Sequence, residues 1–458
     1  MSAPVATGLP SAGTLAALLA GGAVAVAVLA VAMRRREEAL PLLAVLALPF
    51  RVPVAADGRT VNLLIPLYVV IAAGTLVNLL PRALAVLRGG QPEAPAPADP
   101  RADRRAWWLQ WLLLGAVGLY VLQIAYSDDR AKAAENVAFF YLPFGLLFLL
   151  LRDVRWTREL IGRCLLLLVA IAVVLAGVGF VEYAQKKLLL NPKLVAANQY
   201  DNFFRVNSVF FDPSIYGRFL MLVMLCAMTA VLRGSRREAK LGAVVLLWLL
   251  AGLVTSFSQS SIAALLLGLA VLAAYSWGWE RTALAVGALA LLAAAVVAVA
   301  PEGWHLGLRG KHGSANNATT GRAGLIEGGL ELFAEEPLQG FGSGSFEREY
   351  KLHASAREAT SENATSASHT IPVTIAAEQG IAGLALYAAL LAAASLVLFD
   401  GAGRSPPRLA VAACFAALVL HTWTYADFLE DPFTWALLAI GVALARAPRE
   451  QPAPATTV

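Results

Sequence analysis

Residues 15–33 read LAALLAGGAVAVAVLAVAM and contain no charged side chain. Residues 283–300, ALAVGALALLAAAVVAVA, are equally free of charge. A helix that crosses a hydrocarbon core of about 30 Å needs roughly 20 apolar residues, so each stretch predicts a transmembrane helix. Similar stretches recur along the 458 residues, and only 15% of the residues are charged, against about 25% in soluble domains. We therefore predict an all-α, polytopic transmembrane helical bundle.

The apolar pattern predicts 12 to 14 spans, with one large polar insert between two of them. Most basic residues lie in the short connectors, so the net charge of +5 indicates membrane orientation and no nucleic-acid partner. The basic clusters all fall on one face, which the positive-inside tendency makes cytoplasmic. The loop 184–211 and the insert then lie outside. The expected spans are 12–33, 38–54, 61–87, 107–126, 136–152, 159–183, 212–232, 239–256, 258–277, 282–300, 370–399, 408–424 and 432–446. The basic clusters are Arg34–Arg36, Arg101/Arg104/Arg105, Arg152/Arg155/Arg158, Arg233/Arg236/Arg237/Lys240, Arg404/Arg408 and Arg446/Arg449.

Four regions follow from this pattern. Residues 1–300 are expected to form a bundle of about ten spans, and residues 370–447 the C-terminal transmembrane helices. Between them, residues 301–369 form the insert, a large outer loop with short amphipathic helices. Residues 448–458 are a tail that we expect to be disordered. A stiff, proline-rich cytoplasmic linker is expected at Gln91–Pro100.

The cysteines and histidines suggest neither a disulfide nor a metal site. Cys164, Cys226 and Cys414 each lie within an apolar run, where a free thiol packs as a small hydrophobic group. No Cys-x-x-Cys pair occurs, and the histidines have neither HxxxH nor HExxH spacing. We therefore predict no catalytic metal and no other cofactor.

The first polar patch of the outer face is the sequence RVNSVFFDPS at residues 205–214. Asp212, followed by proline, has the sequence of a helix start, where it would cap the helix; substrate binding is the alternative role. Arg205 is the last cation before this helix. Its side chain either reaches to the membrane surface or binds an anion. Arg218 lies about one turn inside the span, and a charge there is a candidate for function.

The second patch, TGRAGLIEGGLELF at residues 320–333, lies in the insert. Leu325, Ile326, Leu330 and Phe333 recur at helical spacing, which predicts a short amphipathic helix. Arg322 lies in its first turn, where the helix dipole disfavours a cation unless an anion binds there; pairing with a glutamate is the alternative. The glycine-rich turn GFGSGSF at residues 340–346 follows, in which Gly340 and Gly342 form either a close-packed turn or a cradle for phosphate.

The third patch begins at His369, at the end of the insert and the start of a long apolar helix. A histidine at a helix start is often structural, but an imidazole held neutral there suits a general base. Gly380 and Gly383 follow at helical spacing and permit close approach of another helix. Asp427 lies in the last outer loop, where it either caps a helix or positions a substrate hydroxyl or an arginine.

Taken in order, these patches resemble the bacterial O-antigen ligase and polymerase family. The family carries a histidine followed by Asn, Ser or Gln, nine further residues and G-x-x-G; this chain keeps the spacing with Thr370 in place of the usual partner. The resemblance runs from Arg205 to Gly383, less than half of the chain. Its elements are Arg205 with a Phe-Asp-Pro helix entry, Ser256–Ser261 between two spans, Arg322, the sequence EPLQGFGSG at 336–344, and His369 with Gly380 and Gly383.

The resemblance implies a GT-C-like, metal-independent membrane glycosyltransferase in the bacterial inner membrane. Its donor would be a glycan on undecaprenyl diphosphate, and its acceptor a second glycan, lipid A–core or another envelope polymer. Arg205 and Arg322 would hold the diphosphate, and His369 would activate the acceptor hydroxyl at the outer face. A transporter or lipid-linked glycan flippase, suggested by the number of spans and by Arg218, is the alternative function; a non-catalytic scaffold is a third.

Overall fold

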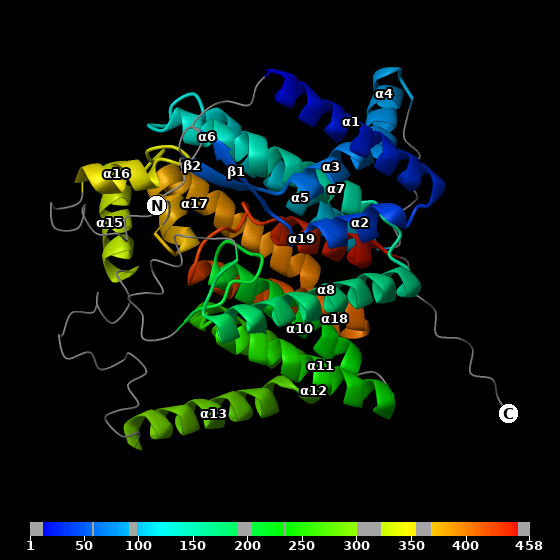
Figure 1. Ribbon diagram of the computed structural model, residues 1–458. Coiled ribbons are helices and arrows are strands. Elements are labelled where there is room, and N and C mark those ends of the chain that lie inside the picture. Colours follow the sequence, from blue (N-terminus) through cyan, green and yellow to red (C-terminus); the bar gives the residue numbers. More distant parts are fainter. Residues whose placement is uncertain are drawn as a thin grey trace. The chain divides into compact units, whose positions relative to one another are not determined.

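The computed structural model describes residues 12–56, 59–90, 99–189, 204–232, 235–299, 322–353 and 368–447 (Figure 1). The helices form two compact units. Unit 1 comprises residues 1–103, 146–258 and 438–458, and unit 2 comprises residues 104–145 and 259–437. The tail, most of the linker 91–100 and residues 300–321 and 354–367 of the insert region lie outside the described residues.

The prediction of a polytopic helical membrane protein is confirmed. Nine helical segments of the described residues are long and apolar enough to cross a membrane. They are Ile65–Leu87, Pro100–Gln123, Arg130–Arg152, Arg158–Gln185, Pro213–Val231, Arg236–Thr255, Gln259–Trp277, Ile371–Arg404 and Pro406–Trp423.

Unit 1 begins with the long helix α1 (Ala12–Arg35) and then departs from the predicted pattern. The expected span 38–54 is wrong: α2 (Ala39–Ala47) has nine residues, which rise only about 13 Å. The chain then forms an antiparallel hairpin of β1 (Val52–Ala56) and β2 (Arg59–Leu63), with Val52 opposite Leu63. The segment Ile65–Leu87 follows as α3 (Ile65–Gly74), the π-helical turn η1 (Thr75–Leu79) and α4 (Leu80–Leu87).

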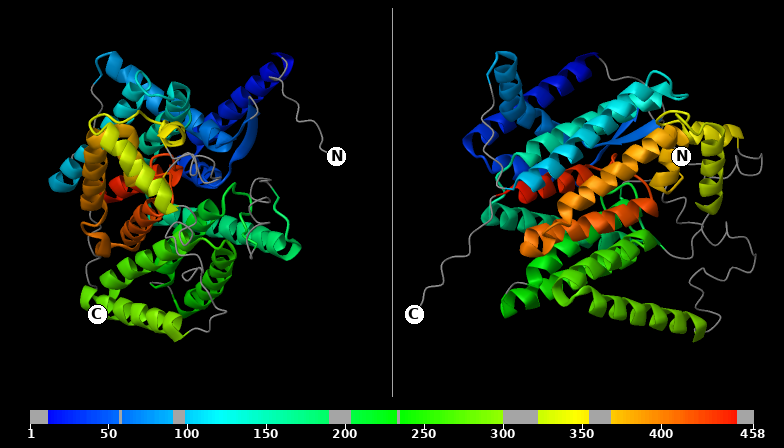
Figure 2. Two further views of the ribbon diagram at one scale, coloured as in Figure 1. Left: turned by 90° about the vertical axis from the view of Figure 1, so that its left-hand side faces the viewer. Right: turned by 180° about the vertical axis from the view of Figure 1, so that it is seen from behind.

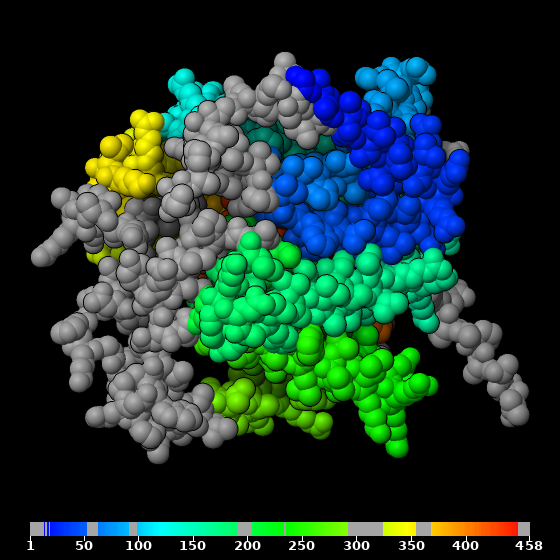
Figure 3. All heavy atoms as spheres, in the orientation of Figure 1, coloured from blue at the N-terminus to red at the C-terminus, as the bar shows by residue number. Residues whose placement is uncertain are grey.

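The second half of unit 1 is built around α10 (Pro213–Val231), which packs against α8 (Arg158–Gln185) and α11 (Arg236–Thr255) (Figure 1). The hydroxyl of Tyr216 on α10 lies beside Gly179 on α8 and Gly252 on α11, and a Cβ on either glycine would lie 2.9 Å from it. Glycine at these two positions therefore lets the three helices approach closely. The outer surfaces of α1 and α8, at the front in Figure 3, carry exposed apolar side chains such as Val24, Val28 and Leu166, as a lipid-facing surface requires.

Unit 2 contains two long antiparallel helices that position the insert. In α5 (Pro100–Gln123), Arg105 pairs with Asp400 beyond the end of α17 (Ile371–Leu398) at 2.5 Å. At the other end, the side-chain amide of Gln123 donates to the carbonyl of Glu378 at 3.2 Å. The basic residues at the start of α5 and after α17 therefore share one end of unit 2. The insert lies at the opposite end, as the predicted topology requires.

The insert contributes two short helices, α15 (Arg322–Glu335) and α16 (Phe346–His353), which lie beside the start of α17 (Figure 2). Also within unit 2, α12 (Gln259–Trp277) packs along α18 (Pro406–Trp423). The remaining elements of the described chain are α6 (Arg130–Asn136), η2 (Val137–Tyr141), α7 (Leu142–Arg152), α13 (Trp279–Val299), η3 (Ala402–Arg404) and α19 (Pro432–Arg446).

Candidate functional site

His369 lies in the turn that leads into α17, and its backbone is held in an unusual conformation. Its φ is +56°, in the left-handed region that residues other than glycine rarely adopt. Ser368 and Thr374 hold this turn: their hydroxyls lie 2.9 Å apart, and the Ser368 hydroxyl donates to the Thr370 carbonyl at 2.8 Å. A non-glycine residue keeps such a conformation only where its surroundings hold it, so the backbone from which the imidazole projects is set before any substrate binds.

The ring of His369 is half-buried and packs against Tyr425, with ring centroids 5.8 Å apart. Tyr425 in turn packs against His421 at 5.6 Å. His421 is fully buried on α18, and its Nε2 lies 3.0 Å from the hydroxyl of Ser261 and 3.4 Å from that of Ser260 at the start of α12. The sequence reasoning missed His421 and Tyr425. The signal was present, because an ionisable residue within an apolar span is a candidate for function.

The glycine-rich turn of the insert packs directly on a break in α17. At Gly380 the helix adopts φ 60° and ψ −160°, and a Cβ there would lie 2.5 Å from the backbone of Leu338. Gly380 therefore permits close approach of the insert. The sequence-based expectation that another helix approaches at Gly380 is wrong. Three backbone hydrogen bonds close the contact, from the amides of Phe341, Gly342 and Ile381 to the carbonyls of Ala377 (3.1 Å), Glu378 (2.7 Å) and Pro337 (2.8 Å).

Gly340 and Gly342 belong to this close-packed turn. Both have positive φ, and a Cβ on Gly340 would lie 2.4 Å from the backbone of Glu378, or on Gly342 2.3 Å from Ser127. The amide of Gly340 donates to Glu336 at 3.1 Å and that of Gly342 to Glu378. Because a phosphate cradle needs backbone amides that point at the ligand, these two amides do not form one. Of the two expected roles, the packed turn is the one that the structure supports.

The amphipathic helix predicted in the insert is present as α15, and Arg322 is its first residue. Its buried face matches the expected one at Leu325 and differs from it at Leu330 and Leu332. Leu325 and Leu332 are buried, whereas Leu330 is 51% exposed. Gly328 lies against the ring of Tyr350, where a Cβ would be 2.4 Å from the ring edge.

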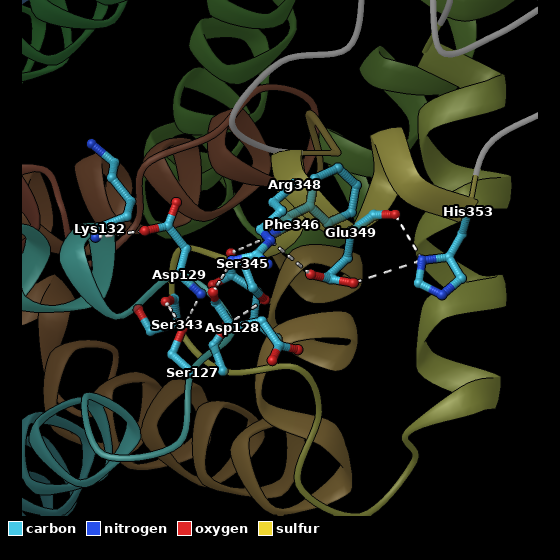
Figure 4. A network of polar contacts seen from close by, with 12 residues as sticks. Ser127, Asp128, Asp129, Lys132, Ser343, Ser345, Phe346, Arg348, Glu349 and His353 are labelled. Carbon is cyan, nitrogen blue, oxygen red and sulfur yellow. Dashed lines mark hydrogen bonds and ion pairs between the residues drawn. The ribbon is translucent and has the colours of Figure 1, made fainter. Parts of the chain in front are cut away.

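Helix α16 is fastened to the connection between α5 and α6 by a polar network (Figure 4). The hydroxyl of Ser127 donates to the Ser343 carbonyl at 2.9 Å, and Arg348 donates to the carbonyl of Asp128. Glu349 lies between Arg348 and His353, with a carboxylate oxygen 3.7 Å from a nitrogen of each. These contacts hold the insert on the end of unit 2 at which His369 lies.

The charges around Glu349 affect its proton affinity. Burial, followed by the nearby carboxylate of Asp128, raises the pKa of Glu349 above its usual value, while His353 and Arg348 oppose the change. The ionised form is therefore disfavoured in the docked helix.

Two acidic residues, Asp427 and Glu430, lie close together in the loop between α18 and α19. The carboxylate of Glu430 accepts a hydrogen bond from Tyr141 at 3.0 Å. Burial, followed by the carboxylate of Asp427, raises the pKa of Glu430 above its usual value. Asp427 itself has φ +67°, and Asp431 accepts a hydrogen bond from the amide of Phe433 at 2.9 Å at the start of α19. The capping role expected in this loop thus belongs to Asp431, and Asp427 instead lies beside a second acid.

Unit 1 contains the other predicted site residues. Asp212 accepts a hydrogen bond from the amide of Ser214 at 2.6 Å and caps α10, as one of its two readings predicts. Arg205 is half-buried, and its Nε donates to the carbonyl of Ser256 at the end of α11 at 3.4 Å. Arg218 is buried within α10. Arg205 belongs to unit 1, and His369 and Arg322 belong to unit 2, so a diphosphate site shared by Arg205, Arg322 and His369 stays a prediction.

Residues 244–388 match the family model described as O-antigen ligase. Over these residues, which we call the O-antigen ligase segment, the chain is similar to that family. The family resemblance predicted from the sequence is therefore confirmed for about a third of the chain. A comparison with curated proteins finds no match.

The O-antigen ligase segment contains most of α11, all of α12, the insert and the first part of α17. It therefore includes Arg322, His369 and the broken helix at Gly380. Arg205, Arg218, His421, Tyr425 and Asp427 lie outside it. Among the described residues, no group of three or more metal-binding side chains comes together.

Proposed function

We propose that this protein transfers a glycan from undecaprenyl diphosphate to an acceptor hydroxyl at the outer face of the bacterial inner membrane. The observation that carries the proposal is the O-antigen ligase segment with His369 held in a fixed turn at the start of α17. The insert helices lie at this end of unit 2, opposite the basic residues at the start of α5. A polar, structured region at the end of a transmembrane bundle suits an enzyme whose donor is anchored in the bilayer.

In the proposed step, the acceptor oxygen bonds to the anomeric carbon of the donor glycan. Its proton passes to His369, and the bond between the anomeric carbon and the phosphate oxygen breaks. Undecaprenyl diphosphate leaves with the bonding electron pair, and the proton on His369 then passes to solvent. A positioned base of this kind contributes roughly 10²–10⁴ in rate.

Arg322 and Arg205 are the proposed ligands of the diphosphate. Charge builds up on the leaving group as the sugar–phosphate bond breaks, so a guanidinium beside it binds the transition state more tightly than the ground state. Arg322 has a further reason to bind an anion, since it begins α15 at the positive end of the helix dipole. With a diphosphate as leaving group, the transfer requires neither a metal nor a covalent intermediate.

Besides the number of spans and Arg218, the broken helix α17 favours a transporter, because transporters use discontinuous helices to bind ions and substrates. In those proteins the carbonyls and amides freed by the break are available to the ligand. Here, the carbonyls of Ala377 and Glu378 accept amides of the insert. The break therefore serves to dock the insert, which favours the transferase.

The proposal is tested with purified protein in lipid nanodiscs and an undecaprenyl-diphosphate glycan as donor. We expect His369→Ala to lower the transfer rate about 10²–10⁴-fold and Arg322→Ala about 10²–10³-fold. His353→Gln is the matched control, since this insert histidine pairs with Glu335 at 3.1 Å and is assigned no chemical role; it should retain transfer. Full activity of both alanine variants would overturn the assigned roles.

A cellular experiment distinguishes a ligase from a polymerase. Cells that lack a polymerase accumulate single repeat units, whereas cells that lack a ligase leave long chains on the carrier lipid. Glycan length in a deletion strain, with the His369→Ala variant supplied in trans, therefore reports on the acceptor class.

A further inference from the structure

His421 is a buried ionisable residue that the proposed reaction does not use directly. It lies near the end of α18 and is fully buried. Enclosing such a group in an apolar bundle is costly unless polar partners surround it. Ser261 and Ser260 provide these partners from the first turn of α12, at 3.0 and 3.4 Å. His421 is thus held in place from a second helix.

Tyr425 connects this buried pair to His369. Its ring lies 5.6 Å from that of His421 and 5.8 Å from that of His369, with interplanar angles of 61° and 44°. Both centroid distances fall within the range of about 4.5–7 Å over which aromatic rings pack favourably. A continuous row of side chains therefore runs from the start of α12, through α18, to the turn before α17.

We propose that Tyr425 and His421 are positioning residues that fix the ring of His369 for proton transfer. The inference rests on the proposed function, in which His369 receives the proton of the acceptor. The turn built by Ser368 and Thr374 holds the backbone of this residue, and a half-buried ring also needs its torsion constrained. Packing against Tyr425 supplies that constraint, and His421 anchors Tyr425 to the bundle.

The constraint matters because proton transfer is sensitive to distance. A general base must come within about 2.6–3.2 Å of the proton donor, and a displacement of about 1 Å can cost about 10²-fold in rate. A loss of ring packing should therefore slow the chemical step and leave donor binding unchanged. A purely structural histidine between α12 and α18 would instead affect the amount of folded protein and leave the kinetic constants of the folded fraction alone.

The kinetic test compares His421→Leu and Tyr425→Leu with conservative variants at the same positions. We expect kcat of the leucine variants to fall about 10- to 100-fold, with the KM for the donor lipid unchanged. Tyr425→Phe keeps the ring, and His421→Gln keeps a group that can bond to Ser261, so both should restore most of kcat. Thr422→Val is the matched control: Thr422 is buried on the same helix and donates to the Val419 carbonyl at 2.9 Å.

A spectroscopic test does not depend on activity. The ring proton resonances of His369, assigned by their loss in His369→Ala, should move in Tyr425→Leu and in His421→Leu and stay in place in Thr422→Val. Tyr425 is half-buried in a loop, so its leucine variant decides the question if His421→Leu does not fold. Unmoved resonances in Tyr425→Leu, or equal losses in kcat for the leucine variants and Thr422→Val, would overturn the inference. Moved resonances together with a fully active His369→Ala would instead overturn the proposed function alone.

Discussion

Glu349 is an acid whose ionised form is disfavoured by the fold. Its pKa is raised above the usual value of 4.5, by burial first and by Asp128 second. The folded state therefore binds the proton more tightly than the unfolded state, and docking of α16 loses stability as the pH rises from 4.5 through the raised pKa. We predict that Glu349→Gln removes this loss. Hydrogen exchange of the α16 amides, corrected for the intrinsic effect of pH on exchange, measures how the stability of the docked helix depends on pH.

Glu347→Gln is the control for this prediction, since Glu347 lies on the same helix, is exposed and pairs with Lys351 at 2.5 Å. This variant should keep the pH dependence of the wild type. Protection of α16 that rises with pH across the same range, or a Glu349→Gln variant that behaves like wild type, would contradict the assignment.

Single residues were predictable from the sequence where their role is local. Asp212 next to Pro213 has the pattern of a helix start, and Asp212 caps α10 as expected. The role of His421 depends on α12, about 160 residues earlier in the chain, and no local pattern carries that information. Asp427 shows the same limit, because its neighbour Glu430 is held by Tyr141 from a distant segment.

At the scale of elements, the insert is fastened to unit 2 where its glycine-rich turn packs on the break in α17. We predict that Gly380→Ala destabilises the protein by roughly 1–3 kcal/mol or more, because its φ of +60° strains any side chain and a Cβ would collide with the backbone of Leu338. Thermal unfolding in detergent and proteolysis of the insert measure the effect. Gly118→Ala on α5 is the control: nothing lies within 4 Å of its Cβ position, so its stability should be unchanged or raised by about 0.5–1 kcal/mol.

Element boundaries followed from hydrophobicity only where the elements are long. Most long spans were predicted to within about four residues, although Pro100–Gln123 and Arg130–Arg152 begin seven and six residues earlier than expected. The expected span 38–54 proved to be the short helix α2 and a strand. Val52 and Val54 favour extended backbone, which the apolar count alone does not register. In α15, Gly329 lies against Val373, where a Cβ would be 2.5 Å from its methyl group. The buried face of α15 therefore includes Gly329, and a pattern of hydrophobic residues does not identify a buried glycine.

At the scale of the whole molecule, the membrane orientation decides whether His369 can meet a lipid-linked donor on the outer face. The orientation predicted from the basic clusters agrees with unit 2, in which Arg105 and Asp400 lie at the end opposite the insert. Which end faces outside stays a prediction, which rests on the tendency of charge in short loops to set the orientation. Contacts of the insert with the spans depend on packing between distant segments and could not be predicted in the same way.

The orientation is tested by labelling single cysteines with a membrane-impermeant maleimide. The native Cys164, Cys226 and Cys414 are first replaced by serine. We then predict that Leu352→Cys, at an exposed position of α16, reacts in cells whose outer membrane has been permeabilised. Arg104→Cys, at an exposed position near the start of α5, should react only after lysis. Labelling in the opposite order would place His369 and the insert on the cytoplasmic side, where the donor glycan is not presented for transfer, and the proposed reaction would then be wrong.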